Sequence, residues 1–593
     1  MLQNAPQAHG RPSMGVRPYN TGRHPERIYP MRVTCLPPLI GLLLMPPTAP
    51  ASPAATEDAK TFVAAHEAKM RPLDVKAGLA WWNANTTGKD EDYKLKEEVQ
   101  NQIDLALSDK ATFAKLKALK EAADKGEIDD AVTARGIVVL YLMYLEKQLD
   151  PELMKQITAK ANAVEKKFNV YRAKVDGKEL ADSQVREALK KSTDSKRRQA
   201  VWEASKGVGA DVAADLKELV TLRNKAAVAL GFKNFHAMSL YLNEQNGEEL
   251  IKLFDELDTL TKEPFLTAKA EFDAKLAKNS EVAVKDLMPW HYHDPFFQES
   301  PAVFDANLDA PFAKADILKL CQDFYKGIGL PIDDVIARSD LYEKKGKSPH
   351  AFCTDIDREG DVRVLANIVP NEYWMGTMLH ELGHSVYSSK NIPKSVPYVV
   401  RGEAHILTTE GVAMQFERFS KSLKWLGEMG VKVENPAAFA VAAEKVRKNQ
   451  LLIFSRWCQV MLRFEKAMYE NPEQDLNKLW WDMVEKYQGL TRPAGRNAPD
   501  YASKIHVVSA PVYYHNYMMG QLFASQVHHA VARDVYKGAD PNTVTYVNEP
   551  KVGEFMKKKV FEPGRTLDWR GLTKFATGSD LSAKAFAADF SSK

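Results

Sequence analysis

The sequence predicts a mainly α-helical protein with one small β-hairpin. After residue 57, apolar residues recur at helical spacing along almost the whole chain, and long stretches with charged outer faces occupy 131–149, 212–230 and 250–276. The one segment that alternates like strands comprises 351–356 and 362–369. Neither a low-complexity linker nor an internal repeat follows residue 57. We therefore expect residues 57–593 to form one large helical domain, with two lobes about a deep central cleft.

Each predicted element has a local reason. The 131–149 segment carries apolar residues from Ile137 to Leu142, and the hairpin is predicted to turn at Arg358-Glu359-Gly360-Asp361. A further helix is predicted over 371–390, because its apolar residues follow helical spacing and Asn391-Ile392-Pro393 ends the pattern. The hairpin therefore lies directly before this helix.

The composition is that of an ordinary globular protein. The 593 residues are 45% hydrophobic and 27% charged, with a net charge of +3. We find no basic stripe with interleaved aromatic residues, so nucleic acid is not an expected partner. Nothing in the mature chain is apolar for long enough to be a transmembrane segment.

The N-terminal 56 residues are predicted to be an extension with a signal peptide. Met1–Pro30 is basic and polar, Met31-Arg32 opens a second start-like pattern, a short apolar stretch covers 36–45, and Ala49-Pro50-Ala51 precedes Ser52. This pattern predicts export, to a bacterial periplasm or by secretion. The alternative is a disordered tail on a cytoplasmic protein. Three cysteines would remain after cleavage: Cys321, Cys353 and Cys458. Because they are odd in number and far apart in the sequence, we expect no disulfide framework.

The most informative motif is His380-Glu381-Leu382-Gly383-His384. Histidines at positions i and i+4 lie on one face of a helix, so both imidazoles can bind the same zinc ion. Glu381 can then act as the general base on a water. The alternative is a half-buried helix whose histidines only form hydrogen bonds.

A hydrolytic zinc site needs a third protein ligand. Glu403 and Glu410 are the two possibilities downstream. Glu403 is expected at the start of the next helix, where a carboxylate also favours the helix N-terminus, whereas Glu410 is expected one to two turns inside that helix. We therefore predict His380, His384 and Glu410 as the metal ligands. Glu417, two turns later on the same face, is expected to orient a ligand.

Other segments give a resemblance to a known family. Leu219 to Lys225 followed by Gly231-Phe232, and Lys486 to Leu490, resemble conserved segments of the peptidyl-dipeptidase A family of zinc metallopeptidases, to which angiotensin-converting enzyme belongs. The likeness extends weakly over 57–590 and strongly around the zinc motif. It implies a large helical metallopeptidase with a deep cleft, one Zn²⁺ on His380, His384 and Glu410, and Glu381 as the base.

The resemblance also implies substrate-binding residues. His350 and Ala351 would line the substrate strand, and Lys504 would bind the C-terminal carboxylate of a peptide. His506 and Tyr517 would donate to the oxyanion, which suits their chemistry. Tyr514 would contact the carboxylate, with Tyr513 as a rival because the preceding loop is one residue longer here.

Several positions depart from the family pattern. Asn516 and Val484 stand where animal enzymes have chloride-binding arginines, so we do not expect chloride activation. Pro349 and Asn367 replace a cysteine pair. The carboxylate-binding glutamine has no clear counterpart, and His291 is the candidate for it.

The predicted function is a zinc-dependent peptidase that releases C-terminal dipeptides from short peptides by attack of a metal-activated water. An oligopeptidase that cuts internally stays open, because the spacing of Glu410 to Glu417 and of Tyr514 to Tyr517 also occurs in the thimet oligopeptidase family. A carboxypeptidase that removes one residue is a further alternative. So is an inactive peptidase-like binding protein, although the intact Glu381 argues against it. The natural substrate and the oligomeric state are not specified by the sequence.

Overall fold

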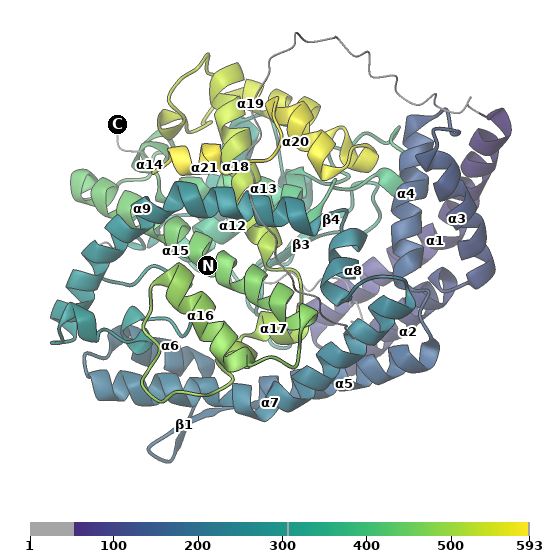
Figure 1. Ribbon diagram of the computed structural model, residues 1–593. Coiled ribbons are helices and arrows are strands. Elements are labelled where there is room, and N and C mark those ends of the chain that lie inside the picture. The colour runs from purple at the N-terminus through teal and green to yellow at the C-terminus, as the bar shows by residue number, and fades with distance from the viewer. Residues whose placement is uncertain (1–51, 305–306, 591–593) are drawn as a thin grey trace, which may run out of the picture.

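A computed structural model describes residues 52–304 and 307–590. These residues form twenty-one α-helices and two small antiparallel sheets, which confirms the prediction of a mainly α fold (Figure 1). The predicted signal peptide lies outside the described residues. The first helices are α1 (Pro53–Thr87), α2 (Asp90–Leu107), α3 (Lys110–Asp124), α4 (Ala131–Glu146), α5 (Pro151–Val170), α6 (Asp182–Lys191), α7 (Ser195–Ala229), α8 (Phe235–Leu242) and α9 (Gly247–Asn279).

The remaining helices surround the zinc motif and complete the chain. They are α10 (Ile317–Gly327), α11 (Asp333–Arg338), α12 (Glu372–Val386), α13 (Ile406–Glu417), α14 (Leu423–Glu428), α15 (Pro436–Glu470), α16 (Leu476–Gln488), α17 (Ile505–Ser509), α18 (His515–Asp534), α19 (Pro550–Met556), α20 (Trp569–Thr577) and α21 (Lys584–Ala588).

Helices α1 to α4 pack together at one side of the molecule (Figure 1). Their contacts form a hydrophobic cluster separate from the main core. Among the described residues, Val399 and Val400 join it from the rest of the chain, and the half-buried Val396 packs against it. Ser52 caps α1 by accepting a hydrogen bond from the Ala55 N–H at 3.3 Å, and Pro53 suits the first helical position. The predicted 131–149 helix is α4, which ends at Glu146.

The predicted 212–230 helix is only the second half of α7. The helix begins at Ser195, where Asp194 accepts a hydrogen bond from the Lys196 N–H at 2.9 Å. The early half escaped sequence analysis because two glycines and a run of charged residues weaken its apolar pattern. The predicted 250–276 helix is α9, which begins three residues earlier and ends three residues later.

The predicted hairpin is present as β3 (Phe352–Asp355) and β4 (Val362–Leu365), paired antiparallel with Cys353 opposite Val364. The prediction of a single hairpin was wrong. A second one consists of β1 (Ala173–Val175) and β2 (Lys178–Leu180). Both residues of its turn, Asp176 and Gly177, have positive φ, as a tight Asp-Gly hairpin turn requires.

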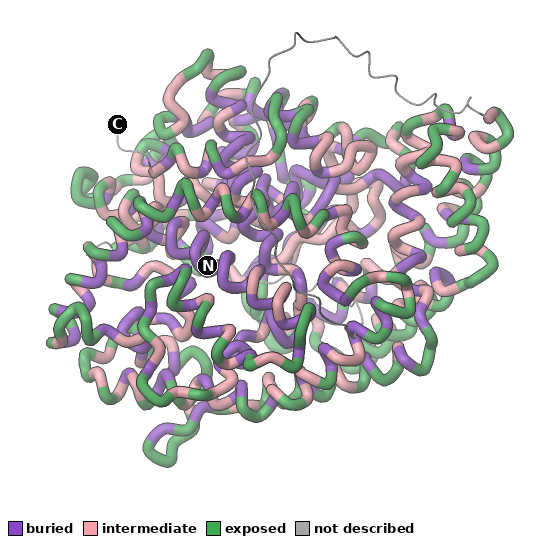
Figure 2. Tube along the Cα trace, in the orientation of Figure 1, coloured by how far each residue is buried: buried purple, intermediate pink, exposed green. Residues whose placement is uncertain are grey.

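The buried centre of the molecule consists of α12, α13 and α18, and α13 packs on both of the others (Figure 2). Two glycines permit this close approach. A Cβ at Gly383 on α12 would lie 2.8 Å from the Ala413 Cα on α13. A Cβ at Gly411 on α13 would lie 2.7 Å from the Gly520 carbonyl oxygen on α18. The helices that carry the predicted metal ligands, Glu381 and Tyr517 are therefore held at short separations.

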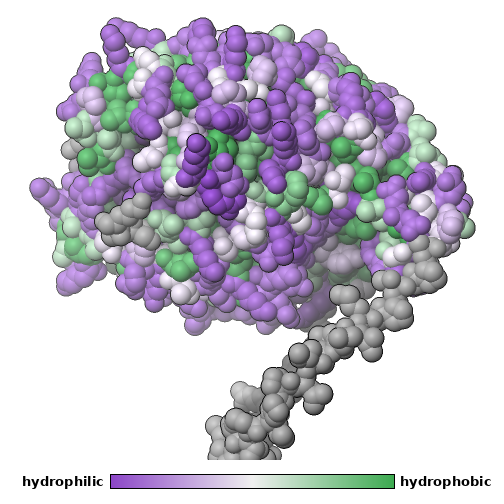
Figure 3. Space-filling view, turned by 90° about the horizontal axis from the view of Figure 1, so that it is seen from above, coloured by the Kyte–Doolittle hydropathy of each residue, from purple (hydrophilic) through white to green (hydrophobic). Residues whose placement is uncertain are grey.

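Seen from above, the surface is mostly hydrophilic, with hydrophobic residues in small scattered groups (Figure 3). In the part of the chain that the structure describes, no helix combines the length and apolar character needed to cross a bilayer. The three described cysteines are free thiols. Cys321 and Cys458 are core residues, whereas Cys353 lies half-buried on β3.

Candidate active site

Helix α12 places both motif histidines. Asn371 caps it by accepting a hydrogen bond from the Trp374 N–H at 2.9 Å. The helix ends at Val386 and not at Lys390 as predicted, because the Ser388 hydroxyl donates to the Ser385 carbonyl at 2.6 Å and draws the chain into a turn. The apolar face of α12 is buried, which leaves the histidines directed towards α13.

Helix α13 supplies the third candidate ligand. It begins at Ile406 with His405 as its N-cap, so the predicted start near Glu403 was wrong. The cause is local: the His405 ring accepts a hydrogen bond from the Leu407 N–H at 3.1 Å. Glu403 lies before the helix, near Asp355 and Arg565. Glu410 lies one turn inside it, buried at 3% exposure.

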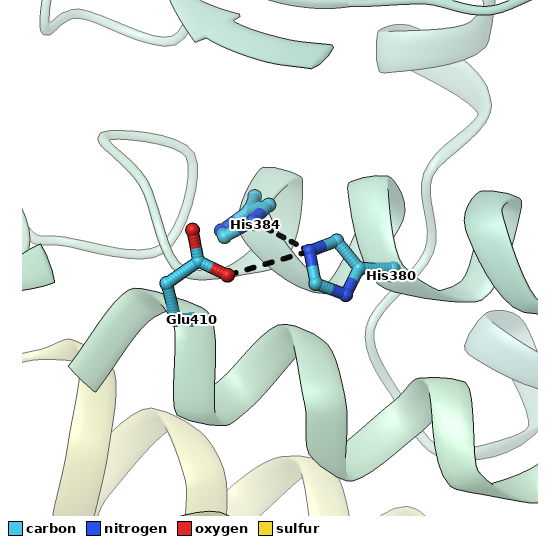
Figure 4. A group of neighbouring side chains, drawn as sticks. All are labelled: His380, His384 and Glu410. Atoms are coloured by element: carbon cyan, nitrogen blue, oxygen red, sulfur yellow. Dashed lines mark hydrogen bonds and ion pairs between the residues drawn. The ribbon is translucent and has the colours of Figure 1, made fainter. Parts of the chain in front are cut away.

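The three predicted ligands converge on one point (Figure 4). The Nε2 atoms of His380 and His384 are 3.2 Å apart, and His380 Nε2 is 3.6 Å from a Glu410 oxygen. One ligand atom from each of the three residues lies within 4.8 Å of the others. Neighbouring ligand atoms of a tetrahedral zinc with bonds of about 2.0–2.1 Å are roughly 3.3 Å apart. The donor set and its spacing therefore fit one zinc ion.

The far side of each imidazole is held by a second group. His380 Nδ1 lies 2.9 Å from a Glu417 oxygen, as predicted for Glu417, and His384 Nδ1 lies 2.8 Å from the Thr409 hydroxyl. Donation from Nδ1 to these oxygens leaves the Nε2 lone pairs for the metal. Burial opposes the charged form of His380, but the hydrogen bond and charge of Glu417 raise its pKa to about 9.

Glu381 belongs to the site without being one of the three ligands. Burial raises the pKa of its carboxyl to about 7, while the positive charge of His380 lowers it. The carboxylate also accepts a hydrogen bond from the Cys353 backbone N–H on β3. Among the described residues, β3 pairs only with β4, so no strand pairs with its other edge. Ala351, just before β3, is buried, whereas His350 is exposed.

Lys504 is a buried residue at another side of the site. Its ammonium donates to the Gln298 side-chain oxygen at 2.6 Å and lies 5.4 Å from the centre of the Tyr514 ring. Burial lowers the pKa of Lys504 to about 8. The choice of His291 as carboxylate-binding partner was wrong, because its two nitrogens are used by Ser195 at 2.8 Å and by the Met288 N–H at 2.8 Å. Gln298 occupies the position beside Lys504, and no local sequence signal identifies it.

His506 and Tyr517 present unused hydrogen-bonding atoms. Both ring nitrogens of His506 and the hydroxyl of Tyr517 are buried and have no hydrogen-bond partner among the described residues. Their ring centres are 6.3 Å apart, and the Tyr514 ring lies 4.8 Å from His506. Burial raises the pKa of Tyr517, and the negative charge of the nearby Glu410 raises it further. Buried polar atoms without partners are rare in native proteins and fit groups that await a ligand.

A strained loop leads from His506 to these tyrosines. Val512 has a φ of +54°, a left-handed conformation that β-branched residues rarely adopt. Its backbone N–H donates to the Glu465 carboxyl at 3.0 Å, and Glu465 is 2% exposed. Burial raises the pKa of Glu465 to about 8. Sequence analysis missed this support for the tyrosines.

Asn516 and Val484, which stand where animal enzymes have chloride-binding arginines, are both uncharged. The Asn516 side-chain oxygen accepts from Gln245 at 2.7 Å, and Gln245 in turn bonds His515 at 2.8 Å. Val484 is a buried apolar residue.

A helical fold with two histidines one turn apart on α12 and a glutamate on α13 around one point is the arrangement typical of zinc metallopeptidases. Comparison with known proteins identifies the family. The sequence profile of the angiotensin-converting enzyme family matches residues 53–282 and 295–592. The chain therefore belongs to the angiotensin-converting enzyme family, as its resemblance implied.

Individual relatives are distant. Angiotensin-converting enzyme of Theromyzon tessulatum is 22% identical over 289 residues, 46% of this chain and 45% of that protein. Angiotensin-converting enzyme of Mesocricetus auratus is 23% identical over 287 residues, 45% of this chain and 21% of that protein. The angiotensin-converting enzyme-like protein Ace3 of Mus musculus is 23% identical over 446 residues, 68% of this chain and 59% of that protein. The matches thus span less than two thirds of each relative.

Proposed function

We propose that this chain is a zinc metallopeptidase that releases dipeptides from the C-terminus of short peptides. The observation that carries the proposal is the buried ammonium of Lys504, whose hydrogen-bond partner is the neutral side chain of Gln298. A buried cation is normally paired with an anion. A peptide's terminal carboxylate would supply that anion.

The residues of α12 and α13 would supply the hydrolytic chemistry. A zinc ion held by His380, His384 and Glu410 would act as a Lewis acid that polarises the scissile carbonyl and lowers the pKa of water. Glu381 would take a proton from the attacking water and pass it to the departing amine as the carbon–nitrogen bond breaks. Its hydrogen bond from the Cys353 N–H supports this role by fixing the carboxylate beside β3.

The remaining groups would bind the substrate on both sides of the scissile bond. His506 and Tyr517 have the free donors that an oxyanion needs. Ala351 and the open edge of β3 would pair with an extended peptide, with exposed His350 at the entrance. Tyr514 would contact the terminal carboxylate alongside Lys504, and its closeness to Lys504 favours it over Tyr513.

Two other functions remain as alternatives with the same zinc site. An oligopeptidase would cut internal bonds without using Lys504, and a carboxypeptidase would release single residues. An inactive binding protein would bind peptides without turnover. Export of the protein also stays a prediction, which rests on the pattern at residues 31–52.

Product analysis separates these functions. Short peptides with free and amidated C-termini are incubated with the protein, and the products are identified by mass spectrometry. We expect dipeptides from free-acid peptides and about ten- to a hundredfold lower kcat/KM on amides, the range of one charge-assisted contact. Lys504→Ala should cause a similar loss on free acids and little further loss on amides. Equal cleavage of amides, release of single residues, or absence of turnover would contradict the proposal.

A further inference from the structure

A second lysine is buried beside Lys504. Lys206 lies on α7 and is 4% exposed. Its ammonium lies 3.2 Å from the centre of the Phe296 ring and 5.4 Å from that of Trp202. The ammonium of Lys504 lies 5.2 Å from the centre of the same Phe296 ring. Two buried cations therefore share one aromatic side chain.

The fold brings these cations together from distant parts of the chain. Helix α7 packs against the residues just before Lys504, and a Cβ at Gly209 would lie 2.4 Å from the Pro499 carbonyl oxygen. Lys206 lies one helical turn before Gly209 on α7, so it is close to the same contact. This close packing fixes Lys206 next to the segment that carries Lys504.

Neither ammonium has a carboxylate within ion-pair distance among residues 52–304 and 307–590. The nearby acids are otherwise engaged. Asp500 forms a bidentate ion pair with Arg496 at 2.6 and 2.7 Å. Asp294 accepts the backbone N–H groups of Phe296 at 2.8 Å and Gln298 at 3.0 Å.

Asp500 and Asp294 therefore act on Lys206 only through the charge they carry, and neither forms an ion pair with it. The proposed terminal carboxylate would pair with Lys504 and leave Lys206 without an anion in direct contact. Aromatic rings stabilise an ammonium, but less than a desolvated hydrogen-bonded carboxylate does. A ligand with a second negative charge would complete the site.

We propose that Lys206 is a specificity-determining residue that binds the side-chain carboxylate of substrates ending in Asp or Glu, while Lys504 binds their main-chain carboxylate. This inference rests on the proposed release of C-terminal dipeptides. It names the substrate class as peptides with an acidic C-terminal residue.

Paired peptides that differ only in a C-terminal Glu or Gln test the inference, because the two side chains have nearly the same shape. We expect the wild type to prefer Glu by about tenfold or more in kcat/KM. Lys206→Met should bring the ratio close to one. Lys225→Met, an exposed position on the same helix, is the matched control and should keep the wild-type ratio.

The pH dependence of the ratio gives a second readout. Burial lowers the pKa of Lys206 to about 7, with Lys504 and Arg496 lowering it further and Asp500 and Asp294 raising it. Lysine loses its charge above its pKa, so the wild-type preference for Glu should fall as pH rises beyond 7. Lys206→Arg should keep the preference for Glu at alkaline pH, because arginine stays charged there. This variant also tests the inference if Lys206→Met does not fold.

The outcomes separate this inference from the proposed function. Dipeptide release from the Gln peptide tests the proposed function, whereas the Glu-to-Gln ratio tests Lys206. Calorimetry with product dipeptides ending in Glu or Gln should show the same preference in binding. A wild-type ratio of one, or a ratio unchanged in Lys206→Met, overturns the inference.

Discussion

Replacing Glu465 by Leu should impair turnover without removing zinc. The Glu465 carboxyl accepts a hydrogen bond from the N–H of Val512, whose φ is +54°. Val512 lies two residues before Tyr514 and five before Tyr517. The side chain of Glu465 is thus a positioning group for both tyrosines, although it touches neither reacting atom.

The magnitude follows from two local energies. A left-handed conformation at a β-branched residue costs of order 1–3 kcal/mol and persists only when its surroundings hold it. An unsatisfied buried N–H costs about 1–3 kcal/mol more. Loss of the acceptor therefore favours a rearranged loop, and a misplacement worth about 1.4–2.8 kcal/mol would lower kcat/KM by roughly ten- to a hundredfold.

Steady-state kinetics with free-acid and amidated peptides, together with zinc analysis, provide the assay. Glu465→Leu should bind one zinc per chain yet lose both rate and discrimination against amides. Glu465→Gln keeps an acceptor oxygen and should remain near wild type. Val512→Gly removes the strain, because glycine adopts positive φ readily, so it should partly rescue Glu465→Leu in the double variant.

Two results would refute this reasoning. One is a Glu465→Leu protein with wild-type kcat/KM and wild-type amide discrimination. The other is a double variant no more active than Glu465→Leu, because the strain at Val512 would then be irrelevant to the tyrosines.

Three further predictions concern the metal, chloride and acid stability. Glu410→Gln should lower the zinc content measured by atomic absorption, whereas Glu403→Gln should not; the opposite ranking would refute the ligand assignment. Because Asn516 and Val484 are uncharged, replacing chloride by acetate at constant ionic strength should change activity little, and a saturable chloride requirement would contradict this. Burial raises the pKa of Asp589, but the hydrogen bond and positive charges of its neighbours outweigh burial, so the net shift is downward. The ionised form of Asp589 therefore stabilises the fold at pH values above the unfolded pKa of about 3.9. Asp589→Asn should therefore unfold more easily in urea at pH 7, by about 3–5 kcal/mol, and the difference from wild type should shrink as pH falls below about 4; a difference independent of pH would contradict it.

The convergence of the three candidate metal ligands was predictable because their arrangement is set by local periodicity. His380 and His384 are one helical turn apart, and Glu410 and Glu417 share a face of the next helix, so sequence spacing alone places them. The start of that helix was misplaced because His405, an unusual N-cap, is not a strong signal. The second hairpin had a usable signal in Asp176-Gly177, but its strands have only three residues each.

The supporting residues were not predictable, because their contacts join distant segments. Gln298 meets Lys504 across 206 residues, and Glu465 meets Val512 across 47. No pattern in either partner's own segment indicates such a contact. The burial of Lys206 beside Phe296 depends likewise on the packing of α7 against a remote turn.

The central claim is that Glu381 acts as the base beside a zinc ion held by His380, His384 and Glu410. The most direct test measures zinc content and peptide turnover of Glu381→Gln side by side with the wild type. We predict one zinc per chain in both proteins and a loss of about 10²–10⁴-fold in kcat for the variant, the range for a general base. Near-normal turnover of a zinc-loaded Glu381→Gln protein would contradict the account.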